Sequence, residues 1–311
     1  MTDKQDTVMG ISFVIPLYNK EKTIENCLAK IFCQNNQSFE VIVVDDGSTD
    51  DSVKNLQAYS DRIHLITQEN QGPSVARNNG ARQASFDYLS FIDADDEITA
   101  DFVESHLQTR RDDIGVELSI NSFKVYEHGV LEREEILSQR YPFPQNQAVL
   151  VIDELVHHFT SNVHSSGFCV NKDVFFRTGG FDEKLRCWEI SDMMTRLSLA
   201  ANKIALVDKV LSLVFADDNS LFKAGREDLE YKKQYCNKIF SVIEQIPDHS
   251  KSRYYREVSN LCYDYWSQRQ FRNLAGLYRQ AMGYPSAGQY FTLPFKLKLI
   301  SSLLSRVIPA N

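Results

Sequence analysis

The first hundred residues alternate short apolar runs with segments of helical periodicity, and this alternation limits the folds open to the chain. The apolar runs lie at residues 11–16, 39–44, 63–66 and 88–92. Short runs bounded by polar residues are typical of buried strands. Strands that alternate with helices join in parallel through right-handed crossovers. We therefore expect an α/β fold with a mostly parallel sheet flanked by helices.

The helices between these strands are predicted from apolar spacing and capping residues. Ile24, Leu28 and Ile31 fall on one face of a helix that Asn19 can cap. A second helix, capped by Ser74, runs to Ala84. Both helices belong to the strand–helix alternation described above.

Composition excludes some classes of function. The 311 residues hold 42 Asp and Glu against 34 Lys and Arg. Nucleic-acid binding rests on phosphate neutralisation, so we expect no nucleic-acid partner. The six cysteines form no CxxC pair, which favours reduced, buried thiols in a cytosolic protein. Because neither a secretory signal nor an apolar run of membrane-spanning length is visible, we predict a cytoplasmic protein.

Carboxylates follow two of the predicted strands. Asp45 and Asp46 follow the second, whereas Asp93, Asp95 and Asp96 follow the fourth. Like charges this close repel one another, and burial strengthens the repulsion. A hard divalent cation such as Mg²⁺ or Mn²⁺, shared with substrate phosphates, would neutralise them. The alternative is that Asp95 and Asp96 cap a helix over residues 97–107.

The strand ends also predict where a ligand binds. In open α/β sheets, ligands bind outside the carboxyl ends of the strands, so residues 16–18, 45–46 and 93–95 should converge. The loop at Gly72 adds Arg77 to this edge. Neither a GxGxxG fingerprint after the first strand nor a GxxxxGK loop is present, which disfavours a Rossmann dehydrogenase or a P-loop kinase.

Four motifs in order resemble those of the family 2 glycosyltransferases with the GT-A fold. They are VIPLYN at 14–19, VDDGSTD at 44–50, NQGPSVARN at 70–78 and DADD at 93–96. The motif GGFD at 179–182 and a predicted helix over 189–197 extend the resemblance. It implies a Rossmann-like GT-A catalytic domain over residues 1–220. Residues 221–311 would form an α-helical C-terminal extension.

The resemblance also assigns roles to residues. It implies that a nucleotide is held by Pro16, Tyr18, Asp45, Asp46, Arg77 and Asp93. Asp95, with Asp93, would ligate a Mn²⁺ or Mg²⁺ ion that bridges the diphosphate. Tyr18 offers a flat face to a base, and Arg77 can fork onto base oxygens or pair with Asp45. The structural alternative is that Tyr18 is half-exposed packing and Arg77 an ordinary charge on the surface of its helix.

The catalytic base departs from the family pattern. Relatives usually carry the Asp of a Glu-Asp pair at the start of a helix, and Ile190 stands at that position here. Glu189 is the nearest carboxylate, and Asp192 lies one helical turn further on the same face. We predict Glu189 and Asp192 as the catalytic residues. The alternative is that both only charge the first turn of the helix.

Other segments carry weaker signals. His157, His158 and His164 have no metal-ligand spacing with the carboxylates, so we predict surface or core histidines. Residues 131–147 are predicted as a polar loop, and residues 227–246 and 250–282 as helices. The tail over 293–308 is basic and follows helical spacing. Such a helix can lie on the inner face of the cell membrane, or it can dock on the protein or on a partner subunit.

Together these features predict an inverting, metal-dependent glycosyltransferase. It would move a sugar from a nucleotide sugar, with UDP as the expected nucleotide, to a hydroxyl of a glycan or lipid-linked acceptor. One alternative, based on Ile190, is a non-catalytic partner subunit that binds a nucleotide or glycan. A second is a sugar nucleotidyltransferase, which needs a glycine-rich basic loop in place of residues 16–19.

Overall fold

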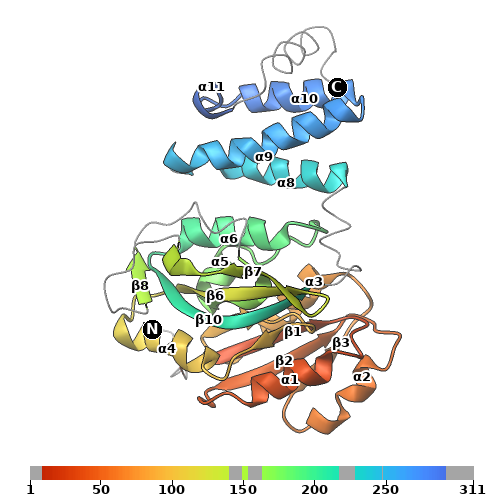
Figure 1. Cartoon of the computed structure of the whole chain (residues 1–311), viewed down its shortest axis with the longest axis vertical. Coiled ribbons are helices and arrows are strands. Elements are labelled where there is room, and N and C mark those ends of the chain that lie inside the picture. The colour runs from red at the N-terminus through yellow and green to blue at the C-terminus, as the bar shows by residue number, and fades with distance from the viewer. Residues whose placement is uncertain (1–8, 140–148, 153–162, 217–227, 247, 292–311) are drawn as a thin grey trace, which may run out of the picture. The chain divides into compact units, whose positions relative to one another are not determined.

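The computed structural model describes residues 9–139, 149–152, 163–216, 228–246 and 248–291 (Figure 1). The chain divides into two compact units. The first holds residues 1–184 and 189–218, and the second holds residues 185–188 and 219–311. The predicted boundary at residue 220, the tail over 293–308, and His157 and His158 all lie outside the described residues.

The first unit is built on a ten-stranded sheet of order β3-β2-β1-β4-β9-β6-β10-β5, with β7 beside β6 and β8 beside β10. Strands β1 to β4 run parallel in the order 3-2-1-4, which confirms the expected parallel sheet for this half. β9 runs antiparallel to β4 and β6, so the whole sheet is mixed. The strands are β1 Ile11–Leu17, β2 Phe39–Asp45, β3 His64–Thr67, β4 Tyr88–Phe91, β5 Glu97–Ile98, β6 Leu118–Glu127, β7 Val130–Glu135, β8 Val149–Ile152, β9 Phe168–Asn171 and β10 Ile204–Ala216.

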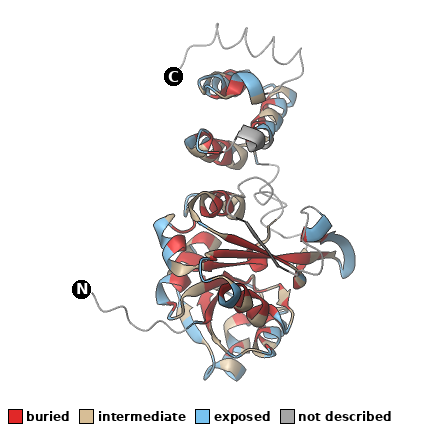
Figure 2. Cartoon of the chain, turned by 90° about the vertical axis from the view of Figure 1, so that its left-hand side faces the viewer, coloured by how far each residue is buried: buried red, intermediate tan, exposed pale blue. Residues whose placement is uncertain are grey.

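Helices cover both faces of this sheet, because side chains along a strand alternate between its faces. In β1, Phe13 and Ile15 join an apolar cluster with α1 and α4, whereas Val14 joins a second cluster with α3, α5 and α6. Figure 2 shows the central strands of this unit coloured as buried, whereas β3 and β7 are largely exposed. The helices are α1 Ile24–Phe32, α2 Ser52–Asn55, α3 Pro73–Gln83, α4 Phe102–Asp112, α5 Lys172–Arg177 and α6 Glu189–Ala200, with the 3₁₀ turns η1 Gln57–Tyr59, η2 Leu137–Gln139 and η3 Ser165–Gly167.

The predicted helix caps are wrong. Asn19 has a φ of 51° and lies before Thr23, the residue that precedes α1. Ser74 lies inside α3, which is preceded by Gly72 at a φ of 94° and begins with Pro73. Glycine reaches this φ without steric cost, and proline favours the first helical turn, so these two residues set the start of α3.

Two other predictions of local structure need correction. A short strand, β5, follows Asp96, and α4 begins only at Phe102, so no helix starts at residue 97. Part of the predicted loop over 131–147 is β7, which forms a hairpin with β6 through Gly129 at a φ of 78°. Residues 140–148 lie outside the described residues.

The second unit is helical, as predicted. Its helices are α8 Leu229–Val242, α9 Asp248–Ser267, α10 Phe271–Met282 and α11 Ala287–Tyr290. The single helix predicted over 250–282 is two helices, separated by a turn in which Arg269 has a φ of 57°. Leu261, Tyr265 and Leu274 of these helices are buried.

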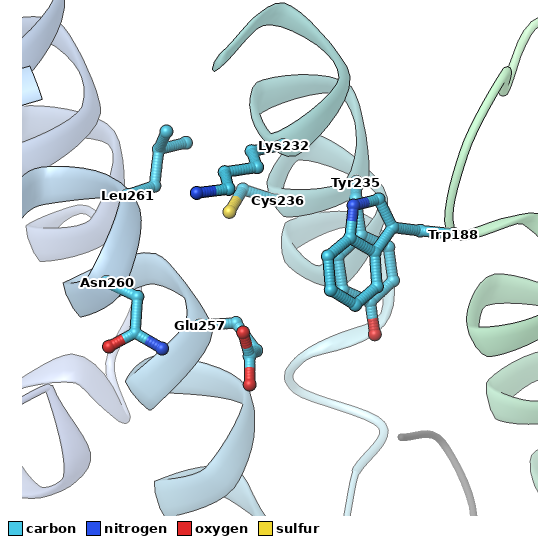
Figure 3. Close-up of a pocket in the computed structure, with 7 residues that line it drawn as sticks. All are labelled: Trp188, Lys232, Tyr235, Cys236, Glu257, Asn260 and Leu261. Atoms are coloured by element: carbon cyan, nitrogen blue, oxygen red, sulfur yellow. The ribbon is translucent and has the colours of Figure 1, made fainter. Parts of the chain in front are cut away.

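A cavity of about 130 Å³ lies within the second unit (Figure 3). Its lining is Trp188, Lys232, Tyr235, Cys236, Glu257, Asn260 and Leu261. The rings of Trp188 and Tyr235 stack with their centroids 5.3 Å apart, and Lys232 pairs with Asp264 at 2.5 Å. None of the predicted site residues lines this cavity.

Among the described residues, no helix combines the length and the apolar character needed to cross a membrane.

Candidate active site

The order 3-2-1-4 creates a switch point between β1 and β4. From β1 the chain moves to β2 and β3 on one side, and it then returns to β4 on the other. Ligands of open α/β sheets bind at the carboxyl ends of the strands at such a point. The segments that leave these ends carry Tyr18, Asp45 and Asp93.

The loops after β1 and β2 are fastened to each other. The backbone N–H of Thr49 donates to Asn19 Oδ1 at 2.8 Å, and that of Asn19 donates to Ser48 Oγ at 3.1 Å. The N–H of Lys20 donates to Ser52 Oγ at 2.7 Å. These contacts explain the left-handed conformation of Asn19. They leave the Tyr18 side chain 45% exposed at the edge of the sheet.

The two acids after β2 are buried and support these loops. Asp45 Oδ1 accepts from the N–H of Ser48 at 3.0 Å. Asp46 accepts from the backbone N–H groups of Gln71 and Gly72, at 2.9 and 2.8 Å. Asp46 therefore holds the loop that leads into α3.

Helix α3 lies close to the sheet and carries Arg77 into the site. A Cβ atom on Gly80 would lie 2.4 Å from Val14 Cγ1, so only glycine allows this approach. Arg77, one turn earlier, is 3% exposed. It donates to Asp93 Oδ1 at 2.7 Å and to Glu189 Oε1 at 3.2 Å. Its partners are thus Asp93 and Glu189, and not Asp45 as the sequence suggested.

The predicted GGFD motif is held between α3 and α6. The side-chain amide of Asn78 donates to the carbonyl oxygen of Phe181 and accepts from its N–H, both at 2.9 Å. From α6, Arg196 donates to the carbonyl oxygens of Thr178 and Gly180, both at 2.8 Å. These bonds couple the two helices that carry Arg77 and Glu189.

Three carboxylates follow β4, and each has a cationic partner. Asp93 pairs with Arg77, and Asp95 pairs with Lys20 at 2.5 Å. Asp96 lies 3.1 Å from His164 Nδ1. Two serines of η3 complete the arrangement, with Ser165 donating to Asp93 and Ser166 to Asp96, both at 2.6 Å.

The predicted helix cap at Asp96 is wrong. Its carboxylate is 1% exposed, and it accepts from Ser166 and from the N–H of Phe215 at 3.2 Å. Asp96 therefore joins the end of β4 to η3 and to β10.

The charges in this cluster are unequally compensated. Burial alone would raise the pKa of Asp93, but Arg77 and His164 outweigh it and hold that pKa at about 2. Burial, Asp96 and Asp93 together raise the pKa of Asp95 to about 6, despite Lys20. Burial opposes the protonation of His164, yet Asp96 and Asp93 raise its pKa to about 9. Asp95 therefore carries a less stabilised negative charge than Asp93 does.

His164 contradicts the prediction made for it. Ligand atoms of Asp93, Asp96 and His164 lie within 4.8 Å of one another, in an arrangement that could hold a metal ion. The spacing of these residues in the sequence could not reveal this group. His164 directly precedes η3 and β9, and it lies near Asp93 and Asp96 because β9 pairs antiparallel with β4. The adjacent serines, Ser165 and Ser166, gave no signal in the sequence either.

The two predicted catalytic acids lie in different surroundings. Glu189 begins α6 and reaches Arg77. Asp192 is 5% exposed and pairs with Arg196 at 2.5 and 3.0 Å. Ile190 packs against the apolar core. The structure thus brings Glu189 to the cluster, whereas Asp192 supports the arginine that holds the GGFD turn.

The sheet order and the acids at its switch point are those of the GT-A class of fold. A crystal structure of S. aureus TarS 1-349 has a similar fold, with a TM-score of 0.64 at 19% identity over 96% of this chain and 87% of that one. TarS 1-349 has also been solved in complex with UDP and with UDP-GlcNAc. Residues 12–161 match the model of glycosyl transferase family 2. These residues therefore form a family 2 glycosyltransferase domain.

Curated relatives agree with this assignment. The glycosyltransferase GlyA of Streptococcus pneumoniae is 42% identical over 98 residues, which are 30% of this chain and 14% of GlyA. The uncharacterized glycosyltransferase EpsJ of Bacillus subtilis is 28% identical over 244 residues, which are 74% of this chain and 68% of EpsJ. The chain spans only about a seventh of GlyA.

Proposed function

We propose that this chain transfers a sugar from a UDP-sugar to a hydroxyl of a glycan or lipid-linked acceptor, with inversion at the anomeric carbon. The contact of Arg77 with both Asp93 and Glu189 carries this proposal. It joins an acid of the expected donor site to a candidate base at the switch point. The complexes of TarS 1-349 with UDP and UDP-GlcNAc support a UDP-linked donor.

The proposed nucleotide contacts rest on the exposed ring of Tyr18 and on the hydrogen-bonding capacity of Asp45 and Arg77. Tyr18 presents an exposed ring on which a base can stack. Asp45 is an acceptor for a ring N–H, and the guanidinium of Arg77 suits the oxygens of a base or ribose. Pro16 stiffens the strand end that carries Tyr18. Asp46 acts through the loop that it holds.

The residues after β4 fit a divalent cation. They offer several carboxylate oxygens, the ligands preferred by Mg²⁺ and Mn²⁺, and Asp95 has excess negative charge around it. Asp95 and Asp93, the two acids that the family motif implies as ligands, would hold the ion. Such an ion supplies Lewis acidity to the departing diphosphate.

Glu189 is the proposed base. Its carboxylate takes the proton of the acceptor hydroxyl as that oxygen attacks the anomeric carbon. The bond from this carbon to the diphosphate oxygen breaks, and the nucleoside diphosphate leaves with the bonding electron pair. One attack from the face opposite the leaving group inverts the anomeric centre.

Ile190 supports one alternative. Its side chain packs on the core where relatives usually carry the base, which suits a non-catalytic subunit that binds a nucleotide or glycan. In that case Glu189 would only balance the charge of Arg77.

The substitution E189Q separates these two functions. Glutamine keeps a hydrogen-bond acceptor for Arg77 but cannot take a proton, so we expect transfer to fall by about 10²- to 10⁴-fold. UDP binding by this variant, measured by calorimetry in the presence of Mn²⁺, should persist. Release of UDP from a panel of UDP-sugars, with and without candidate acceptors, gives the readout. Wild-type protein that binds UDP without any turnover would favour the non-catalytic subunit.

The cellular location that we propose depends on the acceptor. A lipid-linked acceptor would be reached at the inner face of the cell membrane, and the basic segment 293–308 is the proposed contact. Binding to vesicles with anionic lipids, compared between the full chain and a chain ending at residue 291, tests this contact. Equal binding of the two chains would contradict it.

A further inference from the structure

We propose that Lys20 is a built-in counter-ion which a divalent cation must displace from Asp95 before the metal can bind. This inference rests on the proposed function, because it takes Asp95 as a metal ligand. It adds that the free protein binds the metal weakly because of Lys20.

The contact itself is direct. Lys20 Nζ lies 2.5 Å from Asp95 Oδ2, and the two side chains are 31% and 24% exposed. Coulombic attraction to Lys20 opposes the effects of burial, Asp96 and Asp93 on Asp95. The ammonium therefore lies against the carboxylate that the metal would need.

The backbone of Lys20 is fixed, whereas its ammonium can move. Its N–H donates to the fully buried Ser52 hydroxyl, and its carbonyl accepts from the N–H groups of Thr23 and Ile24, both at 3.1 Å. A lysine carries its charge on a flexible four-carbon stem. Lys20 can thus leave Asp95 without any change in the loop that holds it.

The neighbouring cations are less suited to this role. Arg77 is 3% exposed and bridges two carboxylates through a planar fork, so moving it would disturb both partners. His164 faces Asp96, which is almost fully buried. Lys20 is far more exposed than Arg77, and it faces Asp95, whose charge is less compensated than that of Asp93.

Displacement has a thermodynamic consequence. A divalent cation bound to Asp95 would repel an ammonium that remained 2.5 Å from the same carboxylate. The metal must therefore break the Lys20 contact, which lowers its affinity for the free protein. A diphosphate adds negative charge that both cations can share, so we expect Mn²⁺ to bind more tightly when UDP is present.

A Mn²⁺ titration of the chain at pH 8, without nucleotide, tests the proposal. The free ion is measured by electron paramagnetic resonance. K20M should tighten Mn²⁺ binding by about tenfold, because the competing charge is gone. K20R keeps the charge and should resemble the wild type. K22M is the matched control, since Lys22 is an exposed lysine of the same segment. Unchanged or weaker Mn²⁺ binding by K20M would overturn the proposal.

D95N and UDP binding separate this inference from the proposed function. If D95N binds Mn²⁺ as well as the wild type does, Asp95 is not a ligand and the Lys20 proposal fails with it. Calorimetry with UDP in the same samples tests the nucleotide site independently. UDP binding that persists while K20M resembles the wild type would overturn only the role of Lys20.

Discussion

Two buried arginines of the first unit, Arg77 and Arg110, are equally inaccessible but differ in what surrounds them. Arg77 is 3% exposed, at the carboxyl edge of the sheet, and it faces the carboxylates of Asp93 and Glu189. Arg110 is 1% exposed, in the last turn of α4. Among the described residues, it forms no ion pair with a carboxylate.

Neutral groups surround Arg110 instead. It donates to the carbonyl oxygens of His106 and Cys169, at 2.8 and 3.0 Å, and to the hydroxyl of Ser119 at 2.6 Å. Its guanidinium also lies 4.4 Å from the centroid of the Tyr88 ring. Carbonyl dipoles at a helix C-terminus and an aromatic face can both stabilise a cation. Burial alone therefore does not distinguish the two arginines, and the acids at the switch point are the reason for proposing a functional role for Arg77.

The largest expected effect comes from R77K. Lysine keeps the charge but cannot fork onto Asp93 and Glu189 together, so both the donor site and the candidate base lose their positioning. We expect kcat/KM for sugar transfer to fall by about 10²- to 10³-fold. The melting temperature should also fall, because one of the two carboxylates loses its partner, but folded protein should remain. A full loss of stability with normal turnover of the folded fraction would make Arg77 a structural residue like Arg110.

The same exchange at Arg110 should have the opposite outcome. Lysine cannot reach all of the neutral acceptors of Arg110, and buried acceptors left unsatisfied cost about 1–3 kcal/mol. We expect R110K to lower the free energy of unfolding in urea by about 2 kcal/mol and to keep the turnover of folded protein. R111K is the matched control, because Arg111 is exposed and its ion pair with Glu104 is of the weak surface kind. If R110K lost UDP binding, Arg110 would not be purely structural, and the contrast with Arg77 would fail.

The smallest effect is a pH dependence at His106. Burial, and then Arg110, lower the pKa of His106 to about 3, and its ring contacts Ser119 and Asn121. Below pH 6.5 the unfolded chain binds a proton that the folded protein does not, so stability should fall as pH drops toward 3. The slope from this one residue is at most about 1.4 kcal/mol per pH unit. Urea unfolding between pH 7 and pH 5 measures it.

The control for this pH dependence is H106N, which removes the titrating ring. Its own stability will be lower, but the part of the slope that His106 contributes should disappear. An identical slope in both proteins would mean that other groups cause the acid sensitivity.

The sequence predicted the parallel half of the sheet well, for a local reason. Each strand of the segment 11–92 is a short, mainly apolar run, and the residues that follow it mark its carboxyl edge. Glu189 was predicted from the family resemblance, as the residue that starts a helix, and α6 does begin there. Signals of this kind lie within a few neighbouring residues.

The missed features depend on distant partners. Lys20 and Asp95 are 75 residues apart, and His164 meets Asp96 only because β9 lies antiparallel to β4. Arg110 stands in a polar run that resembles an exposed helix face, and its burial follows from packing against the sheet. The left-handed Asn19 was mistaken for a cap because its partner, Thr49, lies in another loop. The roles of the individual site residues stay predictions.

The paired hydrogen bonds between Asn78 and Phe181 have a consequence for distant mutations. A Cβ atom on Gly180, whose φ is 69°, would lie 2.7 Å from Asn78 Oδ1. Even an alanine at this turn would therefore push the Asn78 amide aside and break its hydrogen bonds to Phe181, which couple α3 to α6. The gap across which Arg77 meets Glu189 would then widen, although neither residue had been altered. A glycine in a turn thus acts as a spacer for two side chains that it does not touch.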